Sequence, residues 1–372
     1  MALAYGVAAD ISPHSERGKV LGPMLASTNL GPCIGPVIGG GAILASGDPQ
    51  WCFWALLIFG VSALLLVGWT MPETGRTVVG NGGVKAQGLW RTWFDVVRTS
   101  ARFQMGKNGD VGAWNEGTQN SILCIDDANT GKTGRGKLTF SNPLMFIRII
   151  FYWDTFLILW MAASPYAVWY CIQTSMPLIY GDKYGYNDLV VGLCYLPGGA
   201  GVILGGLLAG RMMDWNYKQT AEKNGWPVDR SRIEDISRFP IEKARSRGSI
   251  AMLVFSICVL TGYGWAVHND VHVSVPLILQ FLIGLKCTIT LQTFSALLVD
   301  IFPSKAGTAG ASNNLMRSVT SAVAVAILQP LVDAIGRGWF FTLIGLGDGL
   351  FGIVAVQFLK RWGQNWRRKR ET

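Results

Sequence analysis

A glycine- and proline-rich apolar segment, residues 22–40, constrains the fold more than any other stretch of the chain. It reads Gly-Pro-Met-Leu-Ala-Ser-Thr-Asn-Leu-Gly-Pro-Cys-Ile-Gly-Pro-Val-Ile-Gly-Gly. In a soluble helix, each glycine costs about 1 kcal/mol and each proline about 3 kcal/mol relative to alanine. In a bilayer, neighbouring helices shield the freed backbone groups, and small residues let two helices approach closely. The segment therefore predicts a membrane-spanning helix that packs tightly against another helix.

The composition indicates an all-α polytopic membrane protein. Half of the 372 residues are hydrophobic and 15% are charged, whereas soluble proteins average about 25% charged residues. Many of the fifteen tryptophans lie near the ends of apolar runs, as in interfacial aromatic belts. We predict eight transmembrane helices of about 20 residues or more, the length that crosses a bilayer: 20–45, 52–70, 153–179, 190–210, 249–267, 275–298, 308–331 and 338–358.

The basic residues predict the topology of these spans. Placing the first residues in the cytosol puts 28 of the 32 Lys and Arg residues in cytosolic segments, as the positive-inside rule favours. Both termini are then cytosolic, and the net charge of +9 needs no nucleic acid to explain it. The expected domains are an amino-terminal remnant (1–70), a cytosolic linker loop (71–152), a six-helix bundle (153–358) and a basic cytosolic tail (359–372) that contacts anionic lipid.

Several motifs carry a resemblance to one transporter family. The spacing Gly22-x8-Gly31-x3-Gly35-Pro36-x2-Gly39-Gly40 resembles the antiporter motif in the fifth transmembrane helix of the major facilitator superfamily. Further stretches resemble its fungal drug:proton antiporter branch, the multidrug-resistance-like exporters: 5–10, 72–76, 239–245, 272–280, 311–317 and 329–339.

The resemblance implies a function. Relatives in this branch have twelve helices, so the chain is expected to be an amino-terminally truncated member that lacks the first four. The family implies proton-coupled export of amphipathic organic compounds, such as drugs or secondary metabolites, by alternating access across the plasma membrane. The expected partners are a small-molecule substrate, protons, the lipid bilayer and a complementing amino-terminal half, with no nucleic acid and no cofactor.

The resemblance also assigns roles to the glycine-rich motif. We expect its residues to act as gate and hinge rather than as ligands, with this helix pressed against the eighth helix of the family fold, which is rich in glycine at Gly201, Gly205, Gly206 and Gly210. Generic close packing of helices is the alternative reading. The residues are Gly22, Gly31, Gly35, Pro36, Gly39 and Gly40.

One face of the span 153–179 is a candidate wall of a substrate cavity. Tyr166, Trp169, Tyr170 and Gln173 lie on one side at helical spacing, between Pro165 and Pro177. Aromatic rings accept flat or cationic drugs through stacking and cation–π contacts, although a packing stripe would have the same pattern. In the span 275–298, polar side chains including Thr288 and Gln292 should face the bundle interior.

Charged residues inside predicted spans are functional candidates by default. Lys286 and Asp348 have opposite signs at similar depth, which suggests a pair that would spare each residue the cost of burial alone. Arg317, with Asn313 and Asn314, fits a stretch of the eleventh helix of the family and could hold an inner gate. For proton coupling, the candidate carboxylates are Asp154, Asp300 and Asp348, of which the first two lie at helix ends.

The remaining patterns argue against an enzyme. Gly131-Lys132-Thr133 mimics the end of a phosphate loop, but Asp126 stands where the first glycine belongs. The seven cysteines form no C-x-x-C pair, and the three histidines are not clustered, so neither a disulfide framework nor a metal site is expected. Two other hypotheses stay open: a membrane-bound transferase, and a non-transporting remnant that associates with a full-length carrier.

Overall fold

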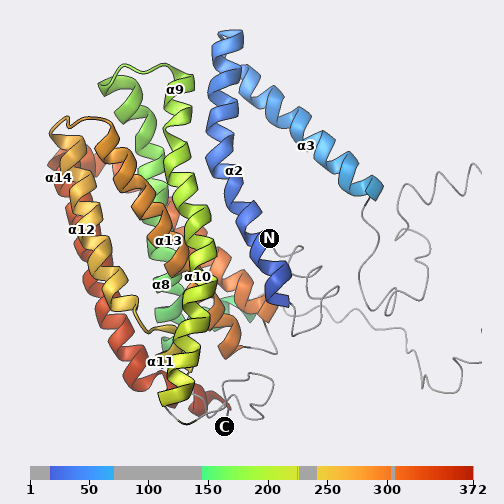
Figure 1. Cartoon of the computed structure of the whole chain (residues 1–372), viewed down its shortest axis with the longest axis vertical. Helices are drawn as coiled ribbons and strands as arrows, with labels where there is room; N and C mark the ends of the chain where they lie inside the picture. The colour runs from blue at the N-terminus through green and yellow to red at the C-terminus, as the bar shows by residue number, and fades with distance from the viewer. Residues whose placement is uncertain (1–16, 71–144, 224, 226–240, 303–305, 372) are drawn as a thin grey trace, which may run out of the picture. The chain divides into compact units, whose positions relative to one another are not determined.

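The structure, a computed structural model, describes residues 17–70, 145–223, 225, 241–302 and 306–371. This part of the chain consists of helices and connecting turns, with no strand (Figure 1). The chain divides into two units. The first contains α2 (Arg17–Ser46), the start of α3 (Gln50–Thr70) and every helix from residue 145 onward. The second contains the remainder of α3, from Leu56.

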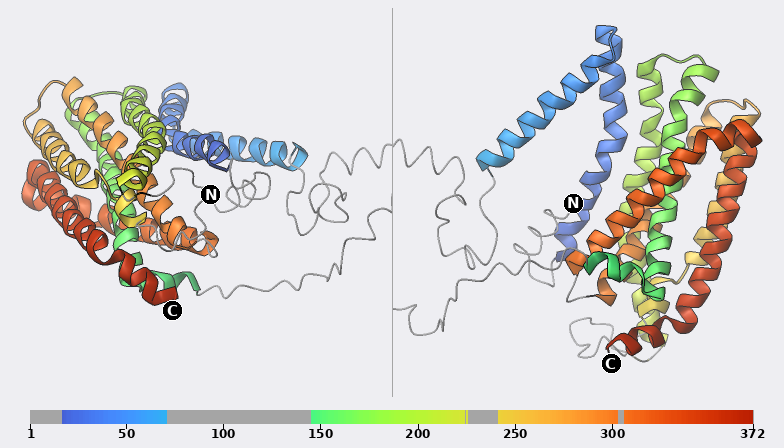
Figure 2. Two further views of the ribbon diagram at one scale, coloured as in Figure 1. Left: turned by 60° about the horizontal axis from the view of Figure 1, so that its bottom comes forward. Right: turned by 180° about the vertical axis from the view of Figure 1, so that it is seen from behind.

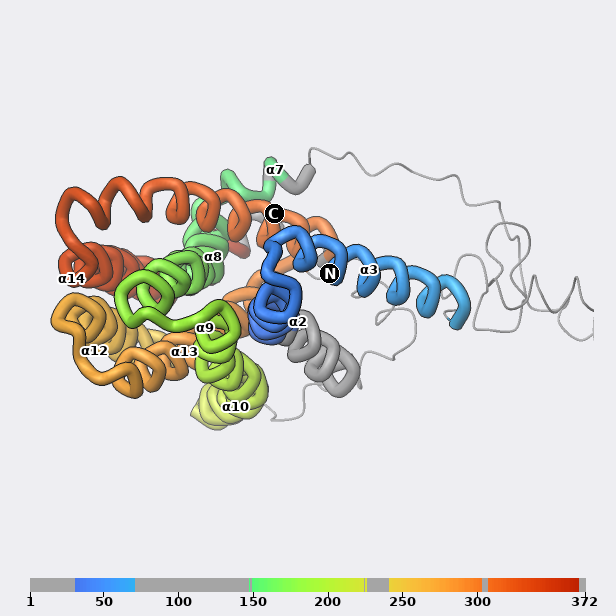
Figure 3. The backbone as a smooth tube through the Cα atoms, turned by 90° about the horizontal axis from the view of Figure 1, so that it is seen from above, coloured from blue at the N-terminus to red at the C-terminus, as the bar shows by residue number. Residues whose placement is uncertain are grey.

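The other helices of the first unit follow in chain order, and Figure 3 shows them from above. α8 contacts both α13 and α14, α10 packs along α13, and α12 packs along α14. Their bounds are α7 (Met145–Ile150), α8 (Trp153–Met176), η2 (Pro177–Lys183), α9 (Asp188–Leu193), α10 (Tyr195–Lys223), α11 (Ile241–Arg245), α12 (Ser249–His268), α13 (Ser274–Ile301) and α14 (Ala306–Glu371).

Six helical stretches in the described part of the chain are long and apolar enough to cross a membrane. They begin at Gln50, Trp153, Asp188, Ile241, Ser274 and Gly307. The last covers 61 residues, which at 1.5 Å per residue is about three times the hydrocarbon thickness of a bilayer. Its helix, α14, joins two helical arms at Gly336, whose φ of 81° and ψ of 159° are not helical. Figure 2 shows the chain turning back along α14.

Two helices extend beyond the predicted spans. α10 continues to Lys223, beyond the expected end at residue 210, and α14 continues through the expected basic tail to Glu371. At the start of the tail, aromatic side chains four residues apart remain in contact. The ring centroids of Phe358 and Trp362 are 4.8 Å apart, and those of Trp362 and Trp366 are 6.4 Å apart. Such pairs support a helix beyond the apolar run. Most of the expected linker loop, residues 71–144, lies outside the described residues.

Local sequence signals explain several helix ends. Pro165 lies inside α8, and at Pro177 the helix gives way to the π-helical turn η2, because proline cannot donate a backbone hydrogen bond. The side chain of Asn187 caps α9 by accepting a hydrogen bond from the Val190 amide at 2.9 Å. Gly248 precedes α12 with a φ of 77°, a conformation that favours glycine.

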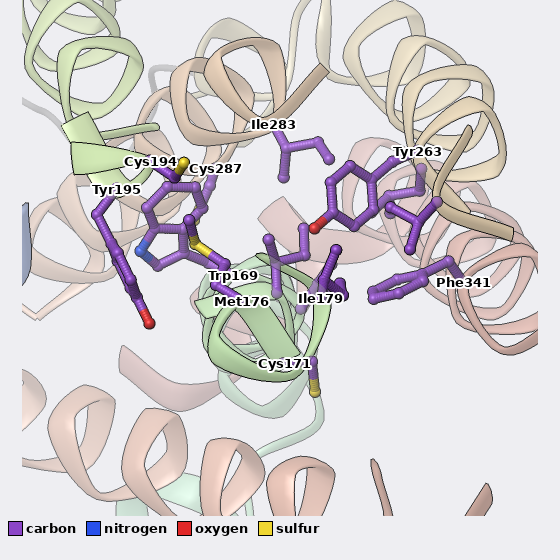
Figure 4. Close-up of a cluster of buried hydrophobic side chains, with 14 of the residues drawn as sticks. Trp169, Cys171, Met176, Ile179, Cys194, Tyr195, Tyr263, Ile283, Cys287 and Phe341 are labelled. Atoms are coloured by element: carbon purple, nitrogen blue, oxygen red, sulfur yellow. The ribbon is translucent and has the colours of Figure 1, made fainter. Parts of the chain in front are cut away.

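The bundle interior is apolar and aromatic. One cluster lies around Ile158, Leu253 and Phe294, and a second joins α8, η2, α12, α13 and α14 (Figure 4). In the second cluster, Tyr263 and Phe341 meet edge to face, with ring centroids 5.1 Å apart. α3, described by itself, has no buried residue. It is hydrophobic all round, the pattern of a helix whose surroundings are lipid or other helices.

Candidate functional site

The carboxy-terminal half of α2 packs closely against α9 and the first turns of α10. A Cβ atom on Gly40 would overlap the carbonyl oxygen of Asp188. A Cβ on Gly192 would lie 2.6 Å from the Pro36 carbonyl oxygen, and one on Gly199 would lie 2.5 Å from Cys33 Sγ. Real Cβ atoms essentially never come within 3.0 Å of a non-bonded heavy atom from another part of the chain. Gly40 and Gly192, on opposite sides of this contact, therefore permit the backbones to meet, and Gly199 leaves room for the Cys33 side chain.

The other motif glycines are placed differently. Gly31 and Gly35 have open space where a Cβ would lie, and Gly39 faces Cys52 Sγ at 3.6 Å. Gly22 is in α2, but its surroundings lie outside the described residues. The expectation that Gly201 and Gly205 receive α2 was wrong, because Cβ atoms there would overlap or closely approach the carbonyl oxygens of Phe281 and Leu285 on α13. The helix pair was anticipated, whereas most of its contact residues were not.

The candidate cavity face on α8 divides into a packed part and an accessible part. Trp169 is 5% exposed, and its ring lies against Gly198 and Gly284, where no Cβ would fit. Figure 4 shows it among the buried side chains. Tyr166 and Tyr170 are half-buried, with ring centroids 4.7 Å apart and the Tyr166 hydroxyl donating to the Tyr170 hydroxyl at 3.0 Å.

The remaining predicted polar residues of the cavity lie on α8 and α13. Gln173 is half-buried on α8, and its backbone carbonyl accepts a hydrogen bond from the Tyr195 hydroxyl at 2.9 Å. Thr288 is buried on α13, where its hydroxyl donates to the Gly284 carbonyl at 3.1 Å. Gln292 is half-buried one helical turn further along, with its Nε2 beside Gly206. Of these three side chains, the two glutamine amides are the more accessible ones.

The structure brings together Lys286 and Asp348. Lys286 Nζ on α13 donates to Asp348 Oδ2 on α14 at 3.2 Å, and each side chain is 4% exposed. The two residues are 62 positions apart in the sequence, so the ion pair links helices that are distant along the chain. Burying either charge alone in an apolar interior would carry a large desolvation penalty, and the opposite charge of the partner offsets it.

Arg317 lies on the first arm of α14, with its guanidinium carbon 4.3 Å from the centre of the Tyr166 ring. Its Nη2 donates to Asn314 Oδ1 at 3.1 Å. Asn313, expected beside it in an inner gate, instead donates to Ser295 Oγ on α13 at 2.9 Å. The two asparagines therefore face different neighbours.

The other two candidate carboxylates are placed away from this group. Asp154 is buried in the first turn of α8, where its Oδ1 accepts a hydrogen bond from Thr155 at 3.4 Å. Asp300, near the end of α13, accepts hydrogen bonds from Arg245 Nε at 3.0 Å and Nη2 at 2.8 Å. The Arg245–Asp300 pair was missed from the sequence, because it links two segments 55 positions apart with no shared motif.

A second interaction missed from the sequence ties the turn after η2 to the loop before α13. The Tyr184 hydroxyl donates to the Val271 carbonyl at 2.8 Å, and Lys183 forms an ion pair with Asp270. Burial, together with the negative charge of Asp270, raises the pKa of Tyr184. Its phenol therefore stays protonated and keeps donating over a wide pH range.

The described side chains supply few of the groups that a metal site or a disulfide would need. Within the described residues, no group of three or more His, Cys, Asp or Glu side chains could hold a metal ion. The six cysteines described there are all free. The described polar groups instead combine a close helix contact, aromatic and amide side chains, and three charges inside apolar helices.

Comparisons with known proteins agree with this description. The profile of the family described as Major Facilitator Superfamily matches residues 1–325. The chain is 33% identical over 376 residues to Citrate exporter 1 of Aspergillus niger, a match that covers 100% of this chain and 67% of that protein. No solved structure matches.

Two further relatives are also fungal. The MFS-type transporter phiD of a fungal species is 31% identical over 369 residues, covering 99% of this chain and 53% of that protein. The MFS-type transporter tstD of Talaromyces stipitatus is 32% identical over 373 residues, a match that covers 99% of this chain and 64% of that protein. The chain thus spans about half to two thirds of the length of these relatives.

Proposed function

The chain belongs to the major facilitator superfamily, and we propose that it forms part of a secondary active transporter that exports organic compounds in exchange for protons. Integral membrane location follows from the family and the apolar helices. The finer assignment is to the fungal drug:proton antiporter branch, in the plasma membrane with both termini cytosolic. The distribution of basic residues supports this orientation.

The proposed membrane arrangement has eight spans. These are α2, α3, α8 with η2, α9 with α10, α12, α13 and the two arms of α14. The break at Gly336 supports counting α14 twice, because a single span of its length would greatly exceed the bilayer thickness.

The observation that carries the proposal is the close approach of α2 to α9 and α10. In a carrier that works by alternating access, one side of the pathway must be sealed while the other is open. Backbone contact at Gly40 and Gly192, with the Cys33 side chain packed on Gly199, would provide such a seal. In the proposed orientation this contact is at the outer side of the membrane. Gly31 and Gly35, which have open space, would gate the pathway in another conformation, with Pro36 and Gly39 as part of the same hinge.

The proposed substrates are amphipathic organic molecules. One relative is named a citrate exporter, which supports export of small organic compounds by this chain as well. The proposed binding surface combines the accessible Tyr166 and Tyr170 rings with the amides of Gln173 and Gln292, while Trp169 and Thr288 support it from behind. We assign the activity to a complete carrier of which this chain forms part, because it spans only about half to two thirds of these relatives.

Transport in proteoliposomes tests this function. The chain would be reconstituted alone and together with the part of the Aspergillus niger relative that it does not match. With an imposed pH gradient, we expect gradient-dependent movement of citrate or of a fluorescent dye such as rhodamine 6G in the complemented sample. A protonophore should abolish it. Transport that ignores the gradient would contradict proton exchange, and no transport of either probe by the complemented carrier would contradict export.

A further inference from the structure

Arg317 is a half-buried positive charge of the helix bundle, and among the described residues no carboxylate pairs with it. Among the described residues, its side chain makes one hydrogen bond, to Asn314, and one cation–π contact, to Tyr166. A guanidinium has five N–H donors in a planar fork, so four of them have no protein acceptor in that part of the chain. Charged side chains within membrane-spanning helices are costly unless they pair, which makes an uncompensated arginine informative.

The neighbouring charges do not neutralise it. Lys286 and Asp348 neutralise each other at 3.2 Å. Cys287, adjacent to Lys286, donates from Sγ to the carbonyl of Pro165 at 3.3 Å, and Pro165 precedes the Tyr166 that lies under Arg317. Lys286 and Asp348 thus compensate each other, and the positive charge of Arg317 is the one left without a carboxylate partner.

Arg317 also changes what the aromatic face can bind. Aromatic rings attract cations through the negative face of the ring, but the guanidinium already lies 4.3 Å above the Tyr166 ring. A cationic ligand approaching this face would meet a positive charge of the protein. An anionic ligand would find the unused donors of the guanidinium, beside the hydroxyls of Tyr166 and Tyr170.

From this geometry we infer that Arg317, with Tyr166 and Tyr170, is the recognition site for the anionic group of an organic acid. The ligand class is an aromatic or amphipathic carboxylate, whose two oxygens match the planar fork of the guanidinium. Its apolar body lies along the tyrosine rings. The inference rests on the proposed export function for its biological role, and names the charge of the transported molecule.

A matched set of probes tests the charge preference. The purified chain in nanodiscs would be titrated calorimetrically with 1-naphthoate, 1-naphthalenemethanol and 1-naphthylmethylammonium, which share one ring system and differ in charge. Since a hydrogen bond to a charged group adds about 1.5 to 3 kcal/mol, we expect naphthoate to bind at least about tenfold more tightly than the alcohol. The ammonium compound should bind most weakly. Equal affinities, tighter binding of the ammonium probe, or no binding of naphthoate would overturn the inference.

Two variants and a chemical-modification experiment test whether Arg317 causes the preference for the anionic probe. Arg317→Gln should reduce naphthoate binding at least about tenfold and leave the alcohol unchanged. Arg211→Gln, which removes an exposed arginine of α10, should change neither. Should Arg317→Gln not fold, phenylglyoxal modification of the native chain replaces it: naphthoate, but not the alcohol, should protect Arg317, as read by peptide mass spectrometry. Naphthoate binding that persists in Arg317→Gln, or absence of protection, would overturn the assignment.

The same probes separate this inference from the export function. Uptake of naphthoate by the complemented carrier in proteoliposomes would be measured under a pH gradient. Arginine-dependent binding without any gradient-driven uptake would overturn export and leave the anion site in place. Uptake that favours the ammonium probe would overturn the anion site and leave export in place.

Discussion

Lys286 on α13 and Asp348 on α14 form an ion pair in the interior of the bundle, with Nζ 3.2 Å from Oδ2. The surrounding contacts of this arm of α14 are apolar: Gly345, Gly349 and Gly352 lie against Leu260, Ile257 and Leu253 of α12. The same arm of α14 thus makes apolar contacts with α12 and an ion pair with α13. The ion pair ties together two helices whose positions matter to any motion of the bundle.

We predict that breaking this pair is worse than removing it. Lys286→Met alone or Asp348→Leu alone should lower stability by about 3 to 5 kcal/mol, because each leaves a buried charge without its partner. The double variant should regain most of that loss, since an apolar pair avoids the desolvation of both ions. The stability of the three variants is measured by thermal unfolding in detergent, with size-exclusion chromatography as the readout. Additive losses in the double variant would show that the two charges do not interact.

We predict that the contact of α2 with α9 depends on Gly40. Gly40→Ala would place a methyl group on the carbonyl of Asp188 and should force the helices apart. Gly41→Ala is the matched control, since its Cβ would meet Leu189 Cδ1 at an ordinary 3.8 Å. Gradient-driven transport by the complemented carrier should fall severalfold only in the first variant, with equal amounts of protein in the membrane. Similar activity of both variants would argue against a seal at this position.

We predict that the contact of α10 with α13 depends on Gly201. Gly201→Ala would overlap the carbonyl of Phe281 and should cost about 1 to 3 kcal/mol through overpacking. Gly210→Ala, at a position with no neighbour within 4 Å, should be neutral or stabilising by up to about 1 kcal/mol, as expected for glycine to alanine in a helix. The melting temperatures of the two variants in the same detergent provide the check. A stable Gly201→Ala protein would contradict the close approach.

We predict that Tyr170 affects selectivity more than stability. Tyr170→Phe removes the acceptor of the Tyr166 hydroxyl, a bond of 3.0 Å, and should change stability by less than about 1.5 kcal/mol. Tyr170→Ala removes the ring as well, and should alter the relative affinities for aromatic and aliphatic acids. Competition against naphthoate by a series of carboxylates measures the spectrum. An unchanged order of affinities in Tyr170→Ala would reduce this face to packing.

Much of the membrane architecture could be predicted because it depends on local composition. The apolar runs placed α2, α3, α8, α12 and α13 to within a few residues of their observed bounds. The resemblance of residues 22–40 to one motif pointed to the family that the profile match also identifies. Opposite charges at similar depth were enough to suggest the Lys286–Asp348 pair. Each of these inferences uses only the position of a residue along its own helix.

What the sequence by itself determined was therefore which segments are apolar helices, how they alternate with basic loops, and which family they resemble. The tertiary structure decided which face of each helix meets which neighbour. A helix turns by 100° per residue, so Gly40 and Gly41 look alike in a sequence although only Gly40 lies against the Asp188 carbonyl. Likewise, the position of Arg317 above Tyr166 joins two helices 151 residues apart, and only packing creates that contact.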